Sequence, residues 1–330
     1  MRQPEVAGRL TALALALLLA APVARDAVSL VRSAAFLAEF LTDGAMPVLS
    51  ALTPAPARAS LGPSVDGWTG ITLGTQPPLL LVHGYAPQGK DDPRLARAAS
   101  LLARAGFDVV VPTLPGLTRG RLRPDDAGPV VHALATRPGP WAMVSVSIGA
   151  APAFAAAADP AVRDRVGVLL ALGPHGSAAE TVRFWLTGVY EFDGVSGRVT
   201  HDPALVHAFL DANADLMDDA TRAALAAGDP AHVERTLEAL PPAVRGLLER
   251  LSPVRAMPDV RARVILVHGY ADPAVPYSES LRLAAARPAR TRVVLLEAVG
   301  HVEAAPGPLW RAARDGIRLL LVFHALRHAG

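Results

Sequence analysis

Short apolar runs alternate with amphipathic segments over most of the chain, and this alternation restricts the fold more than any other feature. The runs occupy residues 79–82, 107–112, 142–146, 166–172, 263–267 and 292–297. Each is too short for a helix, and several are bounded by glycine or proline, as is typical of strands buried on both faces of a sheet. Most of the intervening segments have helical apolar spacing. We therefore predict an α/β fold with a mostly parallel central sheet flanked by helices.

The alternation stops between residues 175 and 257. This region contains no convincing strand, but it contains helical stretches such as ALVHAFLDANADLM and AHVERTLEALPPAVRGLLERL. We expect a helical lid or cap inserted above the sheet. Phe184, Trp185 and Tyr190 are candidates for the apolar wall of a pocket in this insertion, and packing in its core is the alternative for each.

The N-terminal segment has a different character. Residues 10–24 read LTALALALLLAAPVA, an uncharged apolar run that follows Arg2 and Arg9, which is the layout of a secretory signal. The run is short for a membrane-spanning helix. Residues 27–41 are apolar on one helical face, so they can lie on a membrane or pack on the domain. We predict membrane attachment or export rather than a cytoplasmic location; the alternative is an N-terminal helical cap on a soluble protein.

Residues 53–74 are rich in proline, alanine, glycine and serine, which is typical of a linker. We therefore divide the chain into an N-terminal segment, residues 1–57, and a globular domain, residues 58–330, with the insertion at about 175–257. The composition, 51% hydrophobic over 330 residues, allows a sizeable core. The net charge of +2, with scattered arginines, argues against a nucleic-acid partner. The absence of cysteine excludes disulfides, a cysteine nucleophile and thiolate metal sites.

Ser147 is the predicted nucleophile. It lies between an apolar run and an alanine-rich helix, in SVSIGA at residues 145–150, which matches the nucleophile-elbow pattern G-x-S-x-G except that Ser145 replaces the first glycine. Small neighbours are needed because the serine occupies a strained turn packed against the adjacent strand. The N-terminus of the following helix favours a developing oxyanion.

Other candidate residues follow other predicted strands, and in such sheets the chemistry belongs at the carboxyl ends of the strands. Asp272 follows one strand and His301 follows the last. His301 can take the proton from Ser147 as a general base, and Asp272 can orient the imidazole. The alternatives are an Asp-Pro turn residue for Asp272 and a surface-loop histidine for His301.

The loop His83-Gly84-Tyr85 follows the first of these strands. We predict that the backbone amides of Tyr85 and of Ile148, the residue after the nucleophile, form the oxyanion hole. For His83 we favour a structural role beneath the loop. The hexapeptide LVHGYA occurs here and again at residues 266–271, but the flanking sequences differ. We interpret the two copies as separate strands that each enter a tight turn, and we expect no metal site.

Four segments, LLLVHGYAPQGKDDPRLARAASLLARAGFDVVVPTLPGL, SVSIGA, VILVHGYADPAVP and VGHVEAAP, resemble the α/β-hydrolase superfamily. They are most similar to bacterial dienelactone-hydrolase-like and serine-peptidase-like esterases. The resemblance runs from Pro77 to the C-terminus, outside the helical insertion. It implies an α/β-hydrolase fold and a Ser147–Asp272–His301 triad that acts through an acyl-enzyme without a metal or organic cofactor. Dienelactone hydrolases proper use a cysteine nucleophile, where this chain has Ser147.

We therefore expect a serine hydrolase that cleaves a carboxylic ester of a small molecule. Two alternatives are kept. The same triad can act on a peptide or thioester bond. Alternatively, the chain is a membrane-tethered, non-catalytic binding module built on the same fold.

Overall fold

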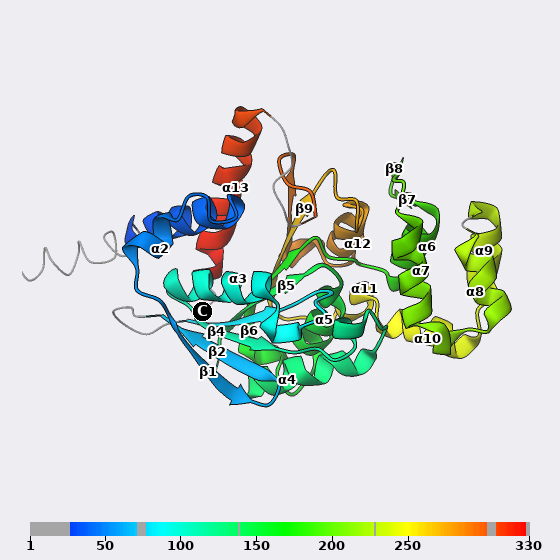
Figure 1. The fold of residues 1–330 in the computed structure, drawn as a ribbon, viewed down its shortest axis with the longest axis horizontal. Helices are drawn as coiled ribbons and strands as arrows, with labels where there is room; N and C mark the ends of the chain where they lie inside the picture. Colours follow the sequence, from blue (N-terminus) through cyan, green and yellow to red (C-terminus); the bar gives the residue numbers. More distant parts are fainter. Residues whose placement is uncertain (1–26, 71–76, 138, 228, 302–307, 328–330) are drawn as a thin grey trace, which may run out of the picture.

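A central sheet of eight strands organises the computed structural model, which describes residues 27–70, 77–137, 139–227, 229–301 and 308–327 (Figure 1). The strand order is β1-β2-β4-β3-β5-β6-β9-β10. The strands from β4 to β10 in this order are all parallel, and β2 and β1 extend the sheet antiparallel at one edge. The predicted mostly parallel sheet is confirmed. The bounds are Ala57–Gly62 (β1), Val65–Thr69 (β2), Pro78–Val82 (β3), Asp108–Pro112 (β4), Trp141–Val146 (β5), Val166–Leu172 (β6), Arg263–Gly269 (β9) and Thr291–Leu296 (β10).

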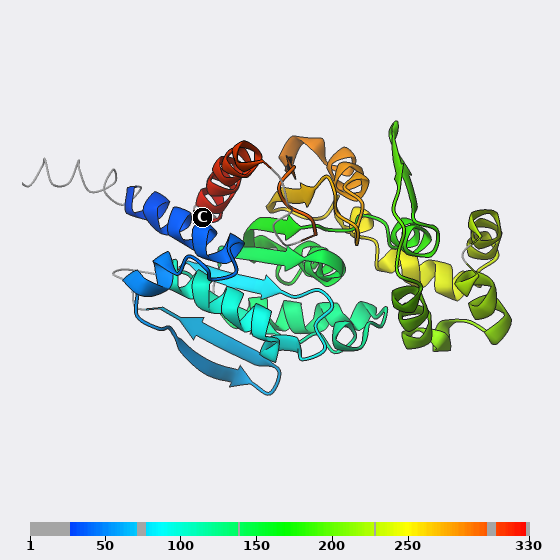
Figure 2. The ribbon, with the colours of Figure 1, turned by 45° about the horizontal axis from the view of Figure 1, so that its top comes forward.

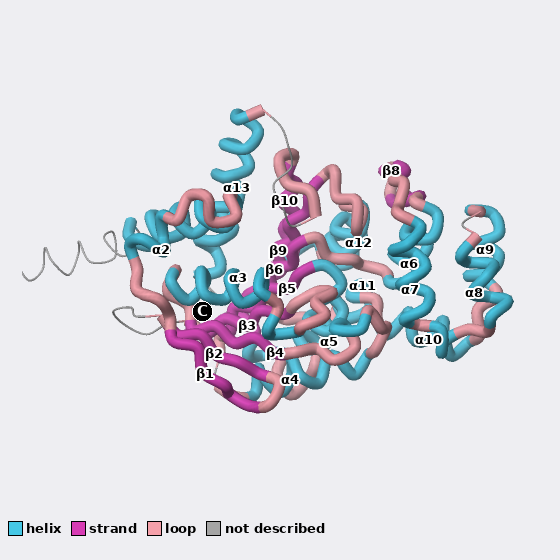
Figure 3. The backbone as a smooth tube through the Cα atoms, viewed as in Figure 1, coloured by secondary structure: helices cyan, strands magenta, loops and turns pink. Residues whose placement is uncertain are grey.

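Helices cover both faces of this sheet (Figures 2 and 3). Along β3, Leu79 and Leu81 face one core and Leu80 and Val82 face the other, as the alternation of side chains in a strand requires. The first core is covered by the helix of residues 27–41, α2 (Val48–Leu52), α3 (Pro93–Arg104) and α13 (Leu309–Arg327). The second core is covered by α4 (Ala127–Ala135), α5 (Ala150–Ala158), α11 (Pro253–Ala256) and α12 (Ser278–Ala286).

The helix of residues 27–41 packs on the domain. Phe36 stacks on Phe323 of α13 with ring centroids 4.4 Å apart, and both side chains are buried. The Phe36 face of this amphipathic helix therefore packs on the domain, as one of the two alternatives expected. The apolar run at residues 10–24 lies outside the described residues. Within the described ranges, no helix combines the length and the apolar character needed to cross a bilayer.

From their composition, we predicted residues 53–74 as a linker, but the structure has strands in this region. They include β1 and β2, which pair antiparallel at the edge of the sheet. Arg58 of β1 donates from Nε to Asp66 of β2 at 2.7 Å, and its guanidinium lies over the ring of Trp68. The composition gives no apolar run here because β1 is exposed at the edge of the sheet and β2 contributes only Val65 and Trp68 to the cores.

The cap between β6 and β9 also contains strands, contrary to the prediction of helices without strands. β7 (Val189–Phe192) and β8 (Val195–Arg198) form a hairpin. Asp193 and Gly194 at its tip both have positive φ, 48° and 77°. Two such residues form the turn that best matches the twist of paired strands, and Asp-Gly is a preferred sequence for it.

Helices make up the rest of the cap, as predicted for the insertion at about 175–257. Their bounds are Ala178–Thr187 (α6), Pro203–Ala212 (α7), Asp219–Ala226 (α8), Pro230–Glu238 (α9) and Pro242–Arg250 (α10). They have a core of their own, which includes Leu210, Val233 and Leu247. Because the chain enters the cap directly after β6, the cap lies at the carboxyl edge of the sheet (Figure 1).

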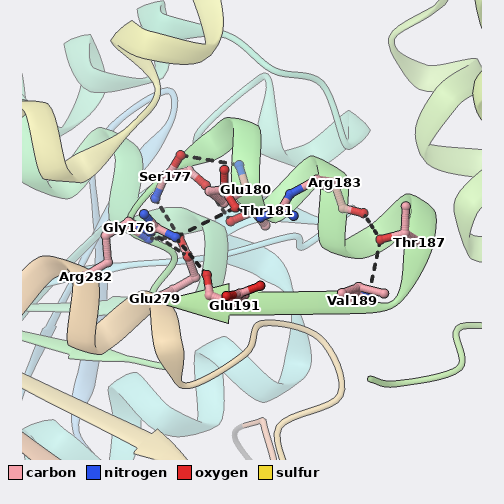
Figure 4. A network of polar contacts seen from close by, with 10 residues as sticks. All are labelled: Gly176, Ser177, Glu180, Thr181, Arg183, Thr187, Val189, Glu191, Glu279 and Arg282. Atoms are coloured by element: carbon pink, nitrogen blue, oxygen red, sulfur yellow. Dashed lines mark hydrogen bonds and ion pairs between the residues drawn. The ribbon is translucent and has the colours of Figure 1, made fainter. Parts of the chain in front are cut away.

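A buried carboxylate fixes the start of the cap to the domain (Figure 4). Glu279 of α12 is 2% exposed and accepts hydrogen bonds from the amides of Gly176 at 3.0 Å and Ser177 at 2.7 Å. Arg282 donates to the same carboxylate from Nε at 3.0 Å. The Glu279 carboxylate therefore lies between the end of β6 and the start of α6. Its hydrogen bonds hold the beginning of the first cap helix against the domain.

Candidate active site

Ser147 occupies the strained turn that the motif predicts. It follows β5 directly and has a φ of 55°, a left-handed conformation that is rare for residues other than glycine. A Cβ atom on Gly149 would lie 2.3 Å from the carbonyl oxygen of His83, so only glycine fits there. A Cβ atom on Gly84 would lie 3.1 Å from the Cβ atom of Ser147. The turn after β5 and the loop after β3 thus approach each other backbone to backbone.

This contact brings together the two segments that carry the predicted oxyanion-hole amides. Tyr85 follows Gly84 in the loop after β3, and Ile148 follows Ser147 in the turn. Beneath the loop, the buried imidazole of His83 donates from Nδ1 to the carbonyl of Gly84 at 2.7 Å and accepts at Nε2 from the amide of Leu114 at 3.0 Å. These bonds agree with the structural role predicted for His83. Burial lowers its pKa.

Asp272 is buried in the turn after β9, and its carboxylate has a donor for each of its four acceptor positions. Oδ2 accepts from Nδ1 of His301 at 2.7 Å and lies 3.3 Å from Nε2 of His268. Oδ1 accepts from the amides of Ala274 at 2.8 Å and Val275 at 2.9 Å. Burial opposes ionisation, but the hydrogen bonds from His268 and His301 outweigh it and hold the pKa of Asp272 well below its usual range. The carboxylate is therefore ionised at neutral pH.

His301 lies in the loop after β10, with its side chain 23% exposed. Because Nδ1 faces the Asp272 carboxylate, it carries the hydrogen, and the neutral ring keeps Nε2 as its acceptor. The imidazole packs against Gly173 at the end of β6, where a Cβ atom would lie 3.1 Å from both Nδ1 of His301 and Oδ2 of Asp272. Since β6 pairs with β5, this contact brings His301 to the strand next to the one that ends at Ser147.

The structure thus joins Asp272 and His301 directly and places Ser147 at the same edge of the sheet. Among the described residues, no hydrogen bond joins Ser147 to His301.

Sequence analysis did not identify His268 as a part of this site. The ring is buried, and Nε2 faces two acceptors, the Asp272 carboxylate and the carbonyl of Val275 at 2.9 Å. Nε2 therefore carries a hydrogen, while Nδ1 lies 2.7 Å from the hydroxyl of Ser280. The spacing His268-x-x-x-Asp272 at the end of a strand was the available signal.

His175 is a second histidine that sequence analysis did not place in the site. It lies in the loop after β6, is buried, and donates from Nε2 to the carbonyl of Leu251 at 3.1 Å. The backbone of Ser147 lies beside the ring. Burial lowers the pKa of His175, although the Leu251 carbonyl, the charge of Glu279 and the Ser147 backbone oppose the shift.

Aromatic side chains connect the cap to the turn that carries Asp272. Trp185 donates from Nε1 to the carbonyl of Ala274 at 2.7 Å. Tyr190 packs edge-on against Tyr277, with ring centroids 6.2 Å apart. Phe184 is fully buried within the cap, so the core alternative holds for this candidate wall residue. The cap therefore contacts the domain directly beside the candidate site.

Comparison with solved structures identifies the fold. No family model matches the chain, and no curated protein matches it. Among solved structures, an acylaminoacyl peptidase in complex with Z-Gly-Gly-Phe-chloromethyl ketone aligns with a TM-score of 0.53 at 15% identity. A puromycin-hydrolyzing peptidase of Mycobacterium tuberculosis aligns with a TM-score of 0.52 at 18% identity. The chain has the α/β-hydrolase fold.

This α/β-hydrolase domain corresponds to only part of those peptidases. The alignments cover 82% and 86% of the chain but 41% and 40% of the two peptidases. The fold prediction is confirmed. The closer similarity to dienelactone-hydrolase-like esterases stays a prediction.

Mild acid should destabilise this α/β-hydrolase domain through its buried histidines. The pKa values of His83 and His175 lie below the usual value of about 6.5, so the folded chain keeps both rings neutral where the unfolded chain takes up protons. Their contribution to stability is complete above about pH 6.5 and is lost as the pH falls from there toward the lower folded-state values. Each can reduce the free energy of unfolding by at most about 1.4 kcal/mol per pH unit.

The variant His175→Gln tests this account because glutamine keeps a donor for the Leu251 carbonyl and does not titrate. We expect a smaller loss of unfolding free energy between about pH 7 and pH 5 in urea denaturation. His232→Gln, at an exposed position, should behave as the unmodified protein. An unchanged pH dependence in His175→Gln would contradict the account.

Proposed function

We propose that this protein is a serine hydrolase that cleaves a carboxylic ester of a small molecule through an acyl-enzyme. The observation that carries the proposal is the 2.7 Å hydrogen bond from His301 to the buried, ionised Asp272. It is made at the same edge of the sheet as the left-handed turn of Ser147. A nucleophile, a base and a carboxylate that orients the base are the three parts that this chemistry needs.

In the proposed first step, Oγ of Ser147 attacks the ester carbonyl while Nε2 of His301 accepts the hydroxyl proton. Asp272 stays ionised and stabilises the imidazolium that forms. Collapse of the tetrahedral intermediate breaks the bond to the leaving alcohol, which takes the proton from His301. Water then attacks the acyl-enzyme with His301 again as the base. This step releases the carboxylic acid and restores the Ser147 hydroxyl.

The developing oxyanion would be stabilised by the backbone amides of Tyr85 and Ile148. The close backbone contact between the loop after β3 and the turn after β5 supports this assignment. Preorganised donors of this kind contribute about 3 to 4 kcal/mol each in serine hydrolases. The tight fit around Gly84 and Gly149 would keep them in place.

We predict that a fluorophosphonate probe labels the protein and that Ser147→Ala abolishes labelling. The variant should also lose roughly four to six orders of magnitude in kcat for a short-chain p-nitrophenyl ester, because the covalent route is removed. Ser145→Ala is the matched control, since Ser145 is a buried serine two residues away. It should keep both labelling and hydrolysis. Labelling that survives in Ser147→Ala would refute the assignment of the nucleophile.

Hydrolysis of an amide at an acylaminoacyl or aminoacyl group is the second candidate. It is favoured by the names of the structural neighbours, an acylaminoacyl peptidase and a puromycin-hydrolyzing peptidase. The same three residues would carry out this reaction, with an amine in place of the alcohol as the leaving group. The cap is the element that would distinguish the two substrate classes, because it borders the turn of Asp272 through Trp185 and Tyr190.

A substrate panel separates the candidates. We expect kcat/KM for short-chain p-nitrophenyl esters to exceed that for the corresponding thioesters and for aminoacyl β-naphthylamides by more than about tenfold. A preference for the aminoacyl amides would favour the peptidase alternative. If the protein neither hydrolyses the panel nor reacts with a fluorophosphonate, the remaining alternative, a non-catalytic binding module, would replace the proposal.

A further inference from the structure

The edge of the sheet opposite the candidate active site is rich in arginine. The chain enters β6, β9 and β10 there, at the amino ends of the strands. A surface hollow of about 400 Å³ lies between these entries. Four arginines and one aspartate provide the charged part of its lining: Arg163, Arg261, Arg263, Arg290 and Asp164.

The positive charge of this hollow is only partly compensated. Arg261 pairs with Asp164 at 2.5 Å, whereas Arg263 donates to the carbonyl of Ala325 at 3.0 Å and Arg290 to the carbonyl of Arg261 at 3.0 Å. A carbonyl oxygen accepts a hydrogen bond from a guanidinium group but does not neutralise the positive charge of that group. The nearest carboxylate to Arg163 in the described chain is that of Asp259, 3.9 Å away. The whole protein carries a net charge of only +2, so the excess of positive charge is a local property of this hollow.

Arg287, next to the hollow in the sequence, also lies close to the positive charge of Arg290. Burial, together with the nearby charge of Arg290, lowers the pKa of Arg287. In addition, Nε of Arg163 is buried without a hydrogen-bond acceptor in the described part of the protein. A multivalent oxyanion would relieve both conditions, because phosphate oxygens accept the paired N–H groups of guanidinium ions.

The helix of residues 27–41 begins at this same edge. The guanidinium groups of Arg32 and Arg327 converge on Gly106, which precedes β4, and would lie 3.4 Å and 3.1 Å from a Cβ atom there. Two apolar side chains in the first turns of the helix, Val28 and Val31, are 52% and 65% exposed. The cap lies at the other end of the molecule (Figures 1 and 2).

We propose that the amino edge of the sheet docks on an anionic membrane surface, with the arginine-lined hollow binding the phosphate groups of lipid headgroups. Basic groups next to a membrane attachment are attracted to anionic lipid, and exposed apolar residues beside them enter the interface. The apolar run at residues 10–24 directly precedes this edge in the sequence. Docking in this orientation directs the cap and the candidate active site away from the membrane. The proposal does not depend on the proposed function.

Flotation of the full-length protein with lipid vesicles tests the proposal. Vesicles of phosphatidylcholine are compared with vesicles that also contain phosphatidylglycerol, and the ratio of the two partition coefficients removes the contribution of the apolar run. The variant Arg261→Gln/Arg263→Gln/Arg290→Gln should reduce this ratio by roughly 100-fold, about fivefold for each arginine. High salt should reduce the ratio for the unmodified protein, because the contact is electrostatic.

The matched control removes three exposed arginines from the cap, Arg198→Gln/Arg235→Gln/Arg250→Gln, and therefore changes the net charge equally. Its ratio should equal that of the unmodified protein. An equal loss in both variants would overturn the proposal, because bulk charge would then explain the binding. The double variant Arg261→Gln/Arg290→Gln, which leaves the contact between Arg263 and Ala325, replaces the triple variant if the latter does not fold.

Titration with inorganic phosphate separates the lipid from a free anion. Saturable binding with a Kd below about 1 mM that is lost in the edge variant, without an effect of anionic lipid on flotation, would assign the hollow to a soluble anion and refute membrane docking. An enhancement by anionic lipid that depends on the edge arginines supports the proposal.

Discussion

The buried charge of Asp272 is the constraint on which the carboxyl edge of this sheet depends. A carboxylate without exposure to solvent costs several kcal/mol unless donors surround it. Here two imidazoles and two backbone amides supply those donors. These contacts hold the turn at residues 272–275 and orient the rings of His268 and His301. The cap attaches to the same turn through Trp185. In the proposed mechanism, this one short segment would link the cap to the orientation of His301.

The two edges of the sheet differ in the sign and the burial of their charged groups. At the carboxyl edge, the carboxylates of Asp272 and Glu279 are buried and hydrogen-bonded, and burial lowers the pKa values of His83 and His175, which keeps these rings neutral. At the amino edge, exposed guanidinium groups gather with few carboxylates. Reaction and attachment would thus use opposite ends of the same strands.

The strands of the central sheet could be predicted because burial on both faces requires an uninterrupted apolar run, as in VGVLLAL of β6. The position of Ser147, Asp272 and His301 after three of those strands follows from the topology of a parallel sheet. The exposed edge strand β1 and the short β2, which adds only Val65 and Trp68 to the cores, leave no such signal, and both were therefore predicted as a linker. The β7–β8 hairpin did leave one, the Asp193-Gly194 pair, and it was missed.

The supporting residues of the site could not be predicted in the same way. His175 is held by a hydrogen bond to the carbonyl of Leu251, 76 residues away in the sequence. Glu279 accepts hydrogen bonds from backbone amides more than 100 residues earlier. No local pattern encodes such contacts, because they arise when the cap packs on the sheet. His268 is the exception, since its partner Asp272 is only four residues away.

The central claim is that Ser147 and His301 act as one unit, oriented by Asp272. The most direct measurement is a double-mutant cycle in kcat/KM for a short-chain ester, with Ser147→Ala, His301→Ala and the double variant. The account predicts that each single variant loses roughly four to six orders of magnitude and that the double variant is no slower than either. Losses that multiply in the double variant, or a His301→Ala variant that keeps most of its activity, would contradict it.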